Sequence, residues 1–132
     1  MKPTIFALAA ASTAAVMMTA APVSAGKNVA ASGQFTGASD HITTGGVSIV
    51  KTANGGAVVI LDSDFSLNGA PDPRVSFGVD GAYKDASDLV ELTSKTGVQV
   101  YIVPPSVNVD DFNEVYIWCR KFSVPLGVAA LK

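Results

Sequence analysis

The sequence predicts an all-β fold: one antiparallel domain shaped as a β-sandwich or as a barrel-like sheet. Short runs rich in β-branched and aromatic residues recur along the chain, and Gly and Pro turns separate them, as in all-β proteins. One of these runs alternates aliphatic with other side chains, which is typical of a half-buried strand. Only Asp85–Ser94 has helical character, and this segment is short.

The first two predicted strands form a hairpin. Val47–Thr52 and Ala57–Asp62 lie on either side of Asn54-Gly55-Gly56. An Asn-Gly step between two β-branched runs is the strongest short-range hairpin signal in a sequence. We therefore expect the two runs to be antiparallel neighbours.

Three further strands follow. Arg74–Val79 reads as a strand closed by an Asp-Gly turn, and Gly97–Val103 alternates three aliphatic residues with Gln99 and Tyr101. Glu114–Phe122 is the most apolar run. Because bulky side chains occupy both of its faces, we expect this strand to be central in the sheet.

The N-terminus predicts export. Lys2 supplies a positive charge, residues 5–21 form an uncharged Ala-rich stretch, and Val23-Ser24-Ala25 has the small-residue pattern of a signal-peptidase site. The many Ala, Ser and Thr residues make the stretch too weakly hydrophobic for a membrane anchor. We expect a signal peptide over 1–25, a flexible lead-in over 26–32, a β domain over 33–132, and a periplasmic or secreted location.

The charge pattern argues against two classes of partner. The chain has a net charge of −2, and removal of residues 1–25 would leave eight basic and eleven acidic side chains, a net charge of −3. The basic residues are scattered singly apart from Arg120-Lys121, so nucleic acid and anionic membranes are poor partners. We expect no stable membrane insertion after cleavage, and a monomer.

The inventory of metal-binding residues excludes several kinds of site. All three Met residues lie within 1–25, so the processed chain would hold one Cys, one His and no Met. Blue copper, structural zinc, iron–sulfur clusters and covalent haem all need more ligands than this, and we expect no metal site. No acid–base pair or phosphate loop is recognisable. Enzymatic activity could arise only through a thiol, and we expect a non-enzymatic role.

Three segments resemble one family. Residues 33–41 (GQFTGASDH), 64–74 (DFSLNGAPDPR) and 117–127 (IWCRKFSVPLG) resemble the opening, central and cysteine motifs of the DM-thirteen domain, often called the electron-transfer DM-thirteen domain. The resemblance covers about residues 33–131. It implies a β-rich extracytoplasmic domain and a redox or haem-binding role for the motif cysteine, which is Cys119 here. The partner would then be an unknown redox protein or small molecule.

Cys119 is the main candidate site residue. Exported proteins normally carry cysteines in pairs, so an unpaired one stays free, binds a group or joins another chain. Cys119 could be a reactive redox thiol, a ligand to non-covalent haem, or a buried structural residue. Lys121 would be its better cationic neighbour, because Arg120 points to the opposite face of a strand. A disulfide-linked dimer ranks lowest, because a cysteine inside an apolar strand is poorly exposed.

His41 is the second candidate, as a ligand to haem or another cofactor. The alternative is a turn residue with an ordinary hydrogen bond. Ser39 and His41 lie too far apart on an extended chain for a catalytic triad.

Aromatic and acidic residues receive simpler interpretations. Tyr116 and Trp118 lie on the strand face opposite Cys119, where they could shield a flat cofactor or relay an electron, but we expect them to be core residues. The Asp residues of the later loops are expected to form turns. Either Asp64 or Asp72 could pair with Arg74.

Overall fold

A computed structural model describes residues 29–132 of the chain. The predicted signal peptide, and residues 26–28 of the predicted lead-in, lie outside the described residues. None of the helical segments within 29–132 is long and apolar enough to span a bilayer.

The all-β prediction is confirmed, and the sheet takes the barrel-like of the two predicted forms. Eight strands form one path in the order β7-β6-β10-β11-β1-β3-β4-β9, with β8 also paired to β6, while β2 and β5 form a separate pair. All pairings are antiparallel. The strands are β1 (Val29–Gly37), β2 (Thr43–Thr44), β3 (Gly46–Lys51), β4 (Ala57–Leu61), β5 (Ser66–Leu67), β6 (Pro73–Val79), β7 (Ala82–Lys84), β8 (Val90–Glu91), β9 (Gln99–Val103), β10 (Glu114–Cys119) and β11 (Val124–Ala130). Two short 3-10 turns complete the fold, η2 (Asp85–Ser87) and η3 (Val109–Asp111).

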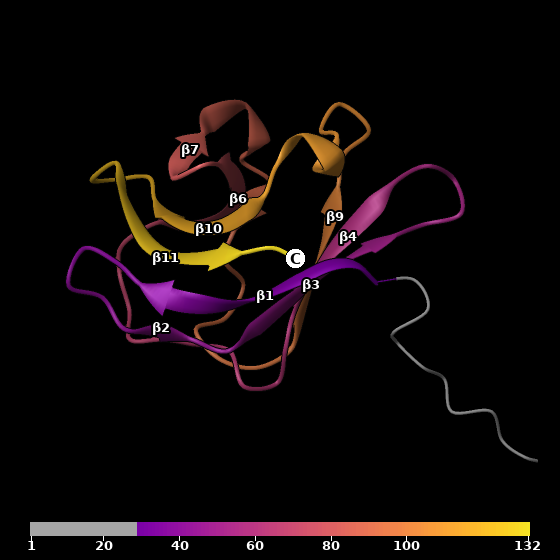
Figure 1. The fold of residues 1–132 in the computed structure, drawn as a ribbon. Helices are drawn as coiled ribbons and strands as arrows, with labels where there is room; N and C mark the ends of the chain where they lie inside the picture. The colour runs from indigo at the N-terminus through magenta and orange to yellow at the C-terminus, as the bar shows by residue number, and fades with distance from the viewer. Residues whose placement is uncertain (1–28) are drawn as a thin grey trace, which may run out of the picture.

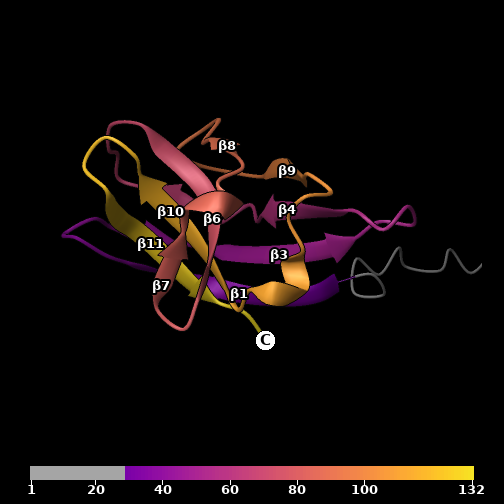
Figure 2. The ribbon, with the colours of Figure 1, turned by 90° about the horizontal axis from the view of Figure 1, so that it is seen from above.

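The sheet curls so that its two halves enclose one core (Figures 1 and 2). One half is β6, β10 and β11, and the other is β3, β4 and β9. Both contribute to the same cluster of buried side chains, which includes Val47, Ile49, Val59, Leu61, Val75, Phe77, Val115, Ile117 and Cys119. Burial of these apolar surfaces against each other is the main stabilising contribution to such a domain.

The predicted Asn-Gly hairpin and the predicted Asp-Gly turn are both present. Strands β3 and β4 pair in register from Val47 with Leu61 to Lys51 with Ala57, and Gly55 in the connecting turn has a φ of +82°. Strands β6 and β7 are joined by Asp80 and Gly81, which both have positive φ, as in the tight turns that favour hairpins. The Asn-Gly and Asp-Gly signals therefore predicted the two turns correctly.

Strand β10 is central, as predicted, with β6 on one side and β11 on the other. It ends at Cys119, three residues earlier than predicted. Arg120–Ser123 form a turn instead, and Ser123 has a φ of 53°. The chain then returns as β11.

The predicted start of the β domain is wrong. Residues 29–32, expected in a flexible lead-in, belong to β1, where Ala31 and Ser32 pair with Ile49 and Ser48 of β3. Small residues give a weak strand signal, but bulky partners in β3 hold them in the sheet. Ser32 and Lys132 also exchange two backbone hydrogen bonds of 3.1 and 2.9 Å, which hold the C-terminus beside β1.

The helical prediction for Asp85–Ser94 is also wrong over most of its length. Only Asp85–Ser87 form a helical turn, of the 3-10 type, and Val90–Glu91 add β8 to the edge of β6. Pairing with β6 satisfies the backbone here, so the local helical preference is overridden.

Strand β9 is half-buried, as its alternation predicts, but its aliphatic face points outward. Gln99, Tyr101 and Val103 are buried. The alternate residues Val98, Val100 and Ile102 are 59–79% exposed. The Tyr101 hydroxyl receives the Thr93 N–H at 3.0 Å and bonds to Gln99 Oε1. These internal partners allow polar side chains to occupy the core face.

Candidate functional site

Cys119 is enclosed by the sheet. It is the last residue of β10, and it is paired with Pro73 of β6 on one side and Val124 of β11 on the other. Its side chain is 1% exposed and belongs to the hydrophobic core cluster. A free cysteine in this setting packs as a small apolar residue.

A loop covers the thiol. Cys119 Sγ donates to the carbonyl oxygen of Pro71 at 3.2 Å, and the next N–H, of Arg120, donates to the carbonyl oxygen of Asp72 at 3.1 Å. Asp72 has a φ of 45°, which bends the loop back over the end of β10. The segment Pro71–Pro73 therefore separates the sulfur from solvent.

The three segments that carry the family resemblance pack against one another at this end of the molecule. Asn68 in the central segment bonds to Ile42, beside the opening segment, through its backbone N–H at 3.0 Å and its side-chain oxygen at 3.1 Å. Thr43 Oγ1 donates to the Leu126 carbonyl at 2.7 Å, and the Ala38 N–H donates to the same oxygen at 3.0 Å. The hydrogen bond from Cys119 to Pro71 joins the cysteine segment to the central segment. Segments far apart in the sequence thus meet around the cysteine motif.

His41 lies in a turn next to this region. Its N–H donates to the Ala38 carbonyl at 3.0 Å, and the two residues between them, Ser39 and Asp40, have φ values of 54° and 63°. The side chain is half-buried, and its Nδ1 atom is buried without a hydrogen-bond partner among residues 29–132. No hydrogen bond within that range joins His41 to Cys119. Across the described residues, no group of three or more His, Cys, Asp or Glu side chains could hold a metal ion.

The two cations after Cys119 point away from the thiol. Arg120 lines a cavity on the opposite face of β10, together with Trp118, as strand alternation predicts. Lys121 Nζ lies over the ring of Phe122, 5.6 Å from its centre. Both cations are exposed in the turn beyond the strand.

An aromatic cluster covers the outer face of β10. Tyr83 of β7 stacks on Trp118 with ring centres 3.8 Å apart and planes at 2°, and Tyr116 meets both rings edge-on. Tyr116 is buried, as predicted, but Trp118 is only half-buried and lines the cavity. The prediction of a core role is therefore wrong for Trp118. Tyr83 is not among the candidates that the sequence predicts; the signal that could have found it is the Asp80-Gly81 step, because Asp-Gly favours a hairpin that returns to β6.

Burial and nearby charges alter the acidity of two of these phenols. Burial, followed by the carboxylates of Asp88 and Asp85, raises the pKa of Tyr83 to about 12. Burial, followed by Glu114, raises the pKa of Tyr116. Both phenols therefore stay protonated and can donate hydrogen bonds at neutral pH.

Arg74 pairs with Asp88 rather than with the predicted Asp64 or Asp72. Its Nε lies 3.1 and 3.3 Å from the two carboxylate oxygens of Asp88. Asp64 instead accepts the Gly46 N–H at 3.0 Å, and Asp72 occupies the positive-φ position of the loop. The acidic residues near the central motif thus serve as turn formers, as expected for Asp in loops.

A comparison with known protein families gives one match. The family described as Electron transfer DM13 matches residues 34–131. The match covers residues 34–41 of the opening segment and the whole of the central and cysteine segments, and it confirms the resemblance drawn from them. No curated protein and no solved structure matches the chain.

Proposed function

The chain belongs to the electron transfer DM13 family, and on this premise we propose that it is a small exported redox module whose redox-active group is the Cys119 thiol. The observation that carries the proposal is that the opening and central family segments both pack against the cysteine motif, the central one through the Pro71 contact with Cys119. The N-terminal sequence of residues 1–25 supports export. The partner would be an extracytoplasmic redox protein or a small disulfide.

We favour a free thiol over a haem ligand. Cys119 is 1% exposed, and its sulfur is bonded to the Pro71 carbonyl. An iron atom at the sulfur would have to displace this loop and part of the surrounding core. The buried Nδ1 of His41, without a hydrogen-bond partner among residues 29–132, favours a ligand, but no hydrogen bond within that range joins it to the thiol.

The proposed chemistry is thiol–disulfide exchange. Segment Pro71–Pro73 moves away, and the Cys119 thiol loses its proton to solvent. The thiolate attacks one sulfur of a disulfide, a mixed disulfide forms, and the other sulfur leaves as a thiolate. Because the thiol is covered in the resting state, its reactivity depends on how often the loop opens.

The test compares two rates on the purified protein. Glutathione disulfide is the probe, mass spectrometry follows modification of Cys119, and hydrogen exchange follows the β10 amides. Each rate is divided by the rate of the same reaction in the unfolded chain, and we expect Cys119 to be slowed by a smaller factor than the β10 amides, because lifting the loop is a smaller opening than unfolding the strand. Equal slowing of the two reactions would mean that the thiol reacts only in unfolded molecules, and the proposal would then fail. Titration with haem, followed by absorbance, tests the ligand alternative.

The second candidate function is a non-catalytic extracytoplasmic binding module with a structural cysteine. The place of Cys119 within the core cluster favours it. Cys119→Ala would then lower the free energy of unfolding by about 1 kcal/mol, as for other small truncations in a core, and leave ligand binding unchanged.

A further inference from the structure

The outer face of β6, β7 and β10 holds a cavity of about 390 Å³, on the other side of the sheet from the Cys119 thiol. Its walls include Arg74, Tyr83, Asp85, Asp88, Trp118 and Arg120. Arg74 and Trp118 are direct cross-strand neighbours, so they share this face. The volume is in the lower range of small-molecule sites in proteins.

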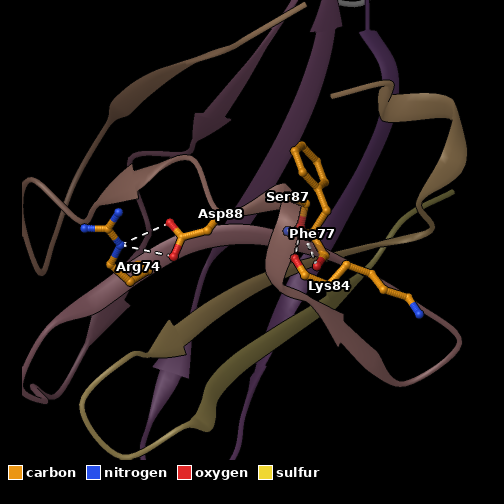
Figure 3. Close-up of polar contacts among 5 residues, drawn as sticks. All are labelled: Arg74, Phe77, Lys84, Ser87 and Asp88. Carbon is orange, nitrogen blue, oxygen red and sulfur yellow. Dashed lines mark hydrogen bonds and ion pairs between the residues drawn. The ribbon is translucent and has the colours of Figure 1, made fainter. Parts of the chain in front are cut away.

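The acidic wall of the cavity is held by Ser87 (Figure 3). The Ser87 hydroxyl accepts the Phe77 N–H at 2.9 Å and lies within hydrogen-bond distance of the Phe77 and Lys84 carbonyl oxygens. Ser87 is buried, so these bonds anchor η2 to β6. The anchored turn places Asp85 and Asp88 at the rim of the cavity.

The Arg74 side chain is held by an ion pair, but that pair uses only one of its three guanidinium nitrogens. Asp88 holds its Nε, and the side chains of this ion pair are only 19% and 16% exposed. The two terminal guanidinium nitrogens have no hydrogen-bond partner among residues 29–132 (Figure 3). A held guanidinium with free N–H groups is a pre-oriented donor for oxygen atoms of a ligand.

The charges of the lining select against ions. Two guanidinium groups, of Arg74 and Arg120, face two carboxylates, of Asp85 and Asp88. Glu91 is the cross-strand neighbour of Arg74 and adds another negative charge nearby. No positive excess attracts an anion. A cation would have to lie beside both guanidinium groups, which repel it.

The lining instead combines donors, acceptors and a flat aromatic wall. The guanidinium groups and the Tyr83 hydroxyl can donate, and the Asp85 carboxylate can accept. One face of the Trp118 ring is covered by Tyr83, and the part of the ring that lines the cavity is an apolar surface beside these groups. A ligand that matches all three is neutral, has an apolar face and carries several hydroxyl groups that both donate and accept. We propose that this cavity binds one sugar ring of a neutral saccharide, with the ring against Trp118 and its hydroxyls bonded to Arg74, Arg120 and Asp85.

The chain contains a single tryptophan, Trp118, so emission excited selectively from tryptophan reports on this cavity. The probes are maltose, cellobiose and N,N′-diacetylchitobiose, added separately to the purified protein. We expect a saturable change in tryptophan emission with at least one of them, with a dissociation constant of about 1 mM, as suits a shallow site for a small ligand.

Exposed residues of the lining provide the variants. Arg120→Ala and Asp85→Asn each remove a polar partner at a surface position, and we expect each to weaken binding at least about tenfold. Lys121→Ala is the matched control, because Lys121 is exposed next to Arg120 but does not line the cavity. Cys119→Ser should leave binding unchanged, which separates this site from the redox proposal.

Three outcomes would overturn the proposal. The first is the absence of a saturable change with all three saccharides. The second is saccharide binding that Arg120→Ala and Asp85→Asn leave intact, since the ligand would then lie elsewhere. The third is saturation by 4-hydroxybenzoate but by no saccharide, which would assign the cavity to aromatic acids.

Discussion

Trp118 and Cys119 are neighbours in sequence but lie in opposite environments. The Cys119 side of β10 is a closed core, covered by Pro71–Pro73 and without solvent contact. The Trp118 side is open, with stacked rings and charged side chains around a cavity. One strand thus separates a protected thiol from an accessible polar surface. The motif cysteine and the cavity beside Trp118 can therefore have separate functions.

The largest expected effect is a loss of stability when the core on the Cys119 side of β10 is truncated. Ile117→Ala truncates a side chain that is 0% exposed on the Cys119 face, and it should lower the free energy of unfolding by about 2–5 kcal/mol. Ile102→Ala is the matched control in another strand, where the same side chain is 79% exposed. Urea denaturation of both variants measures the difference. Similar losses in the two would show that the Cys119 face is not closed.

The next largest effect is a loss of stability when the Arg74–Asp88 ion pair on the Trp118 side is broken. Asp88→Asn leaves the Arg74 guanidinium without its charged partner in a half-buried position, and it should cost about 2 kcal/mol. Asp110→Asn breaks the ion pair with Lys51, where the side chains are 50% and 64% exposed, and should cost less than about 1 kcal/mol. Chemical denaturation at neutral pH compares them. If Asp88→Asn costs no more than Asp110→Asn, the Arg74 pair does not organise the cavity wall.

A smaller effect concerns the contact that joins the opening and cysteine segments. Thr43→Val removes the hydroxyl that donates to the Leu126 carbonyl, and we expect a loss of about 1 kcal/mol. Thr44→Val changes the exposed neighbour in the same short strand and serves as the control. Thermal unfolding of both variants measures the effect. Equal melting temperatures would indicate that this contact does not hold the segments together.

The smallest effect is a pH dependence on the open side. The pKa of Tyr83 is raised to about 12 in the folded chain from an ordinary value of 10.0. The folded state therefore holds the phenolic proton more tightly than the unfolded state does, and this tighter binding stabilises the fold. The stabilisation is fully present below pH 10.0 and is lost as pH rises toward about 12. Absorbance of tyrosinate, compared between the wild type and Tyr83→Phe, assigns the titration. A Tyr83 midpoint near 10.0 would mean that the phenol is not shielded by burial and carboxylates.

The sequence predicts much of the closed side. Turn signals located the β3–β4 hairpin and the Asp-Gly turn that ends β6, and bulky side chains on both faces of Glu114–Phe122 indicated a central strand. The alternation along that strand also assigned Cys119 and Trp118 to opposite faces. These features depend on local chemistry and period, which a single sequence carries directly.

The sequence does not predict strand β11. Pro125 and Gly127 argue against a strand, yet Pro125 lies opposite Trp118 at a register shift, where a missing N–H is tolerated. Gly127 lies against Thr43, with no room for a side chain. Both residues fit for reasons that depend on distant segments.

The open side was harder to predict than the closed side. The cavity depends on Tyr83 reaching across to Trp118, on Ser87 anchoring η2, and on Asp88 rather than a nearer acid pairing with Arg74. Each of these contacts joins residues at least ten positions apart. Propensity and spacing do not encode such pairings, so only the folded chain reveals which polar groups surround the cavity.

The two hydrogen bonds between Ser32 and Lys132 hold the beginning and the end of the β domain next to each other. Because the two ends of the domain already lie side by side, a short peptide could join them with little loss of chain entropy. New ends opened within the exposed Asn54-Gly55 turn would interrupt no strand. The connectivity of this domain is therefore suited to circular permutation, and a reporter inserted at that turn would leave both faces of β10 untouched.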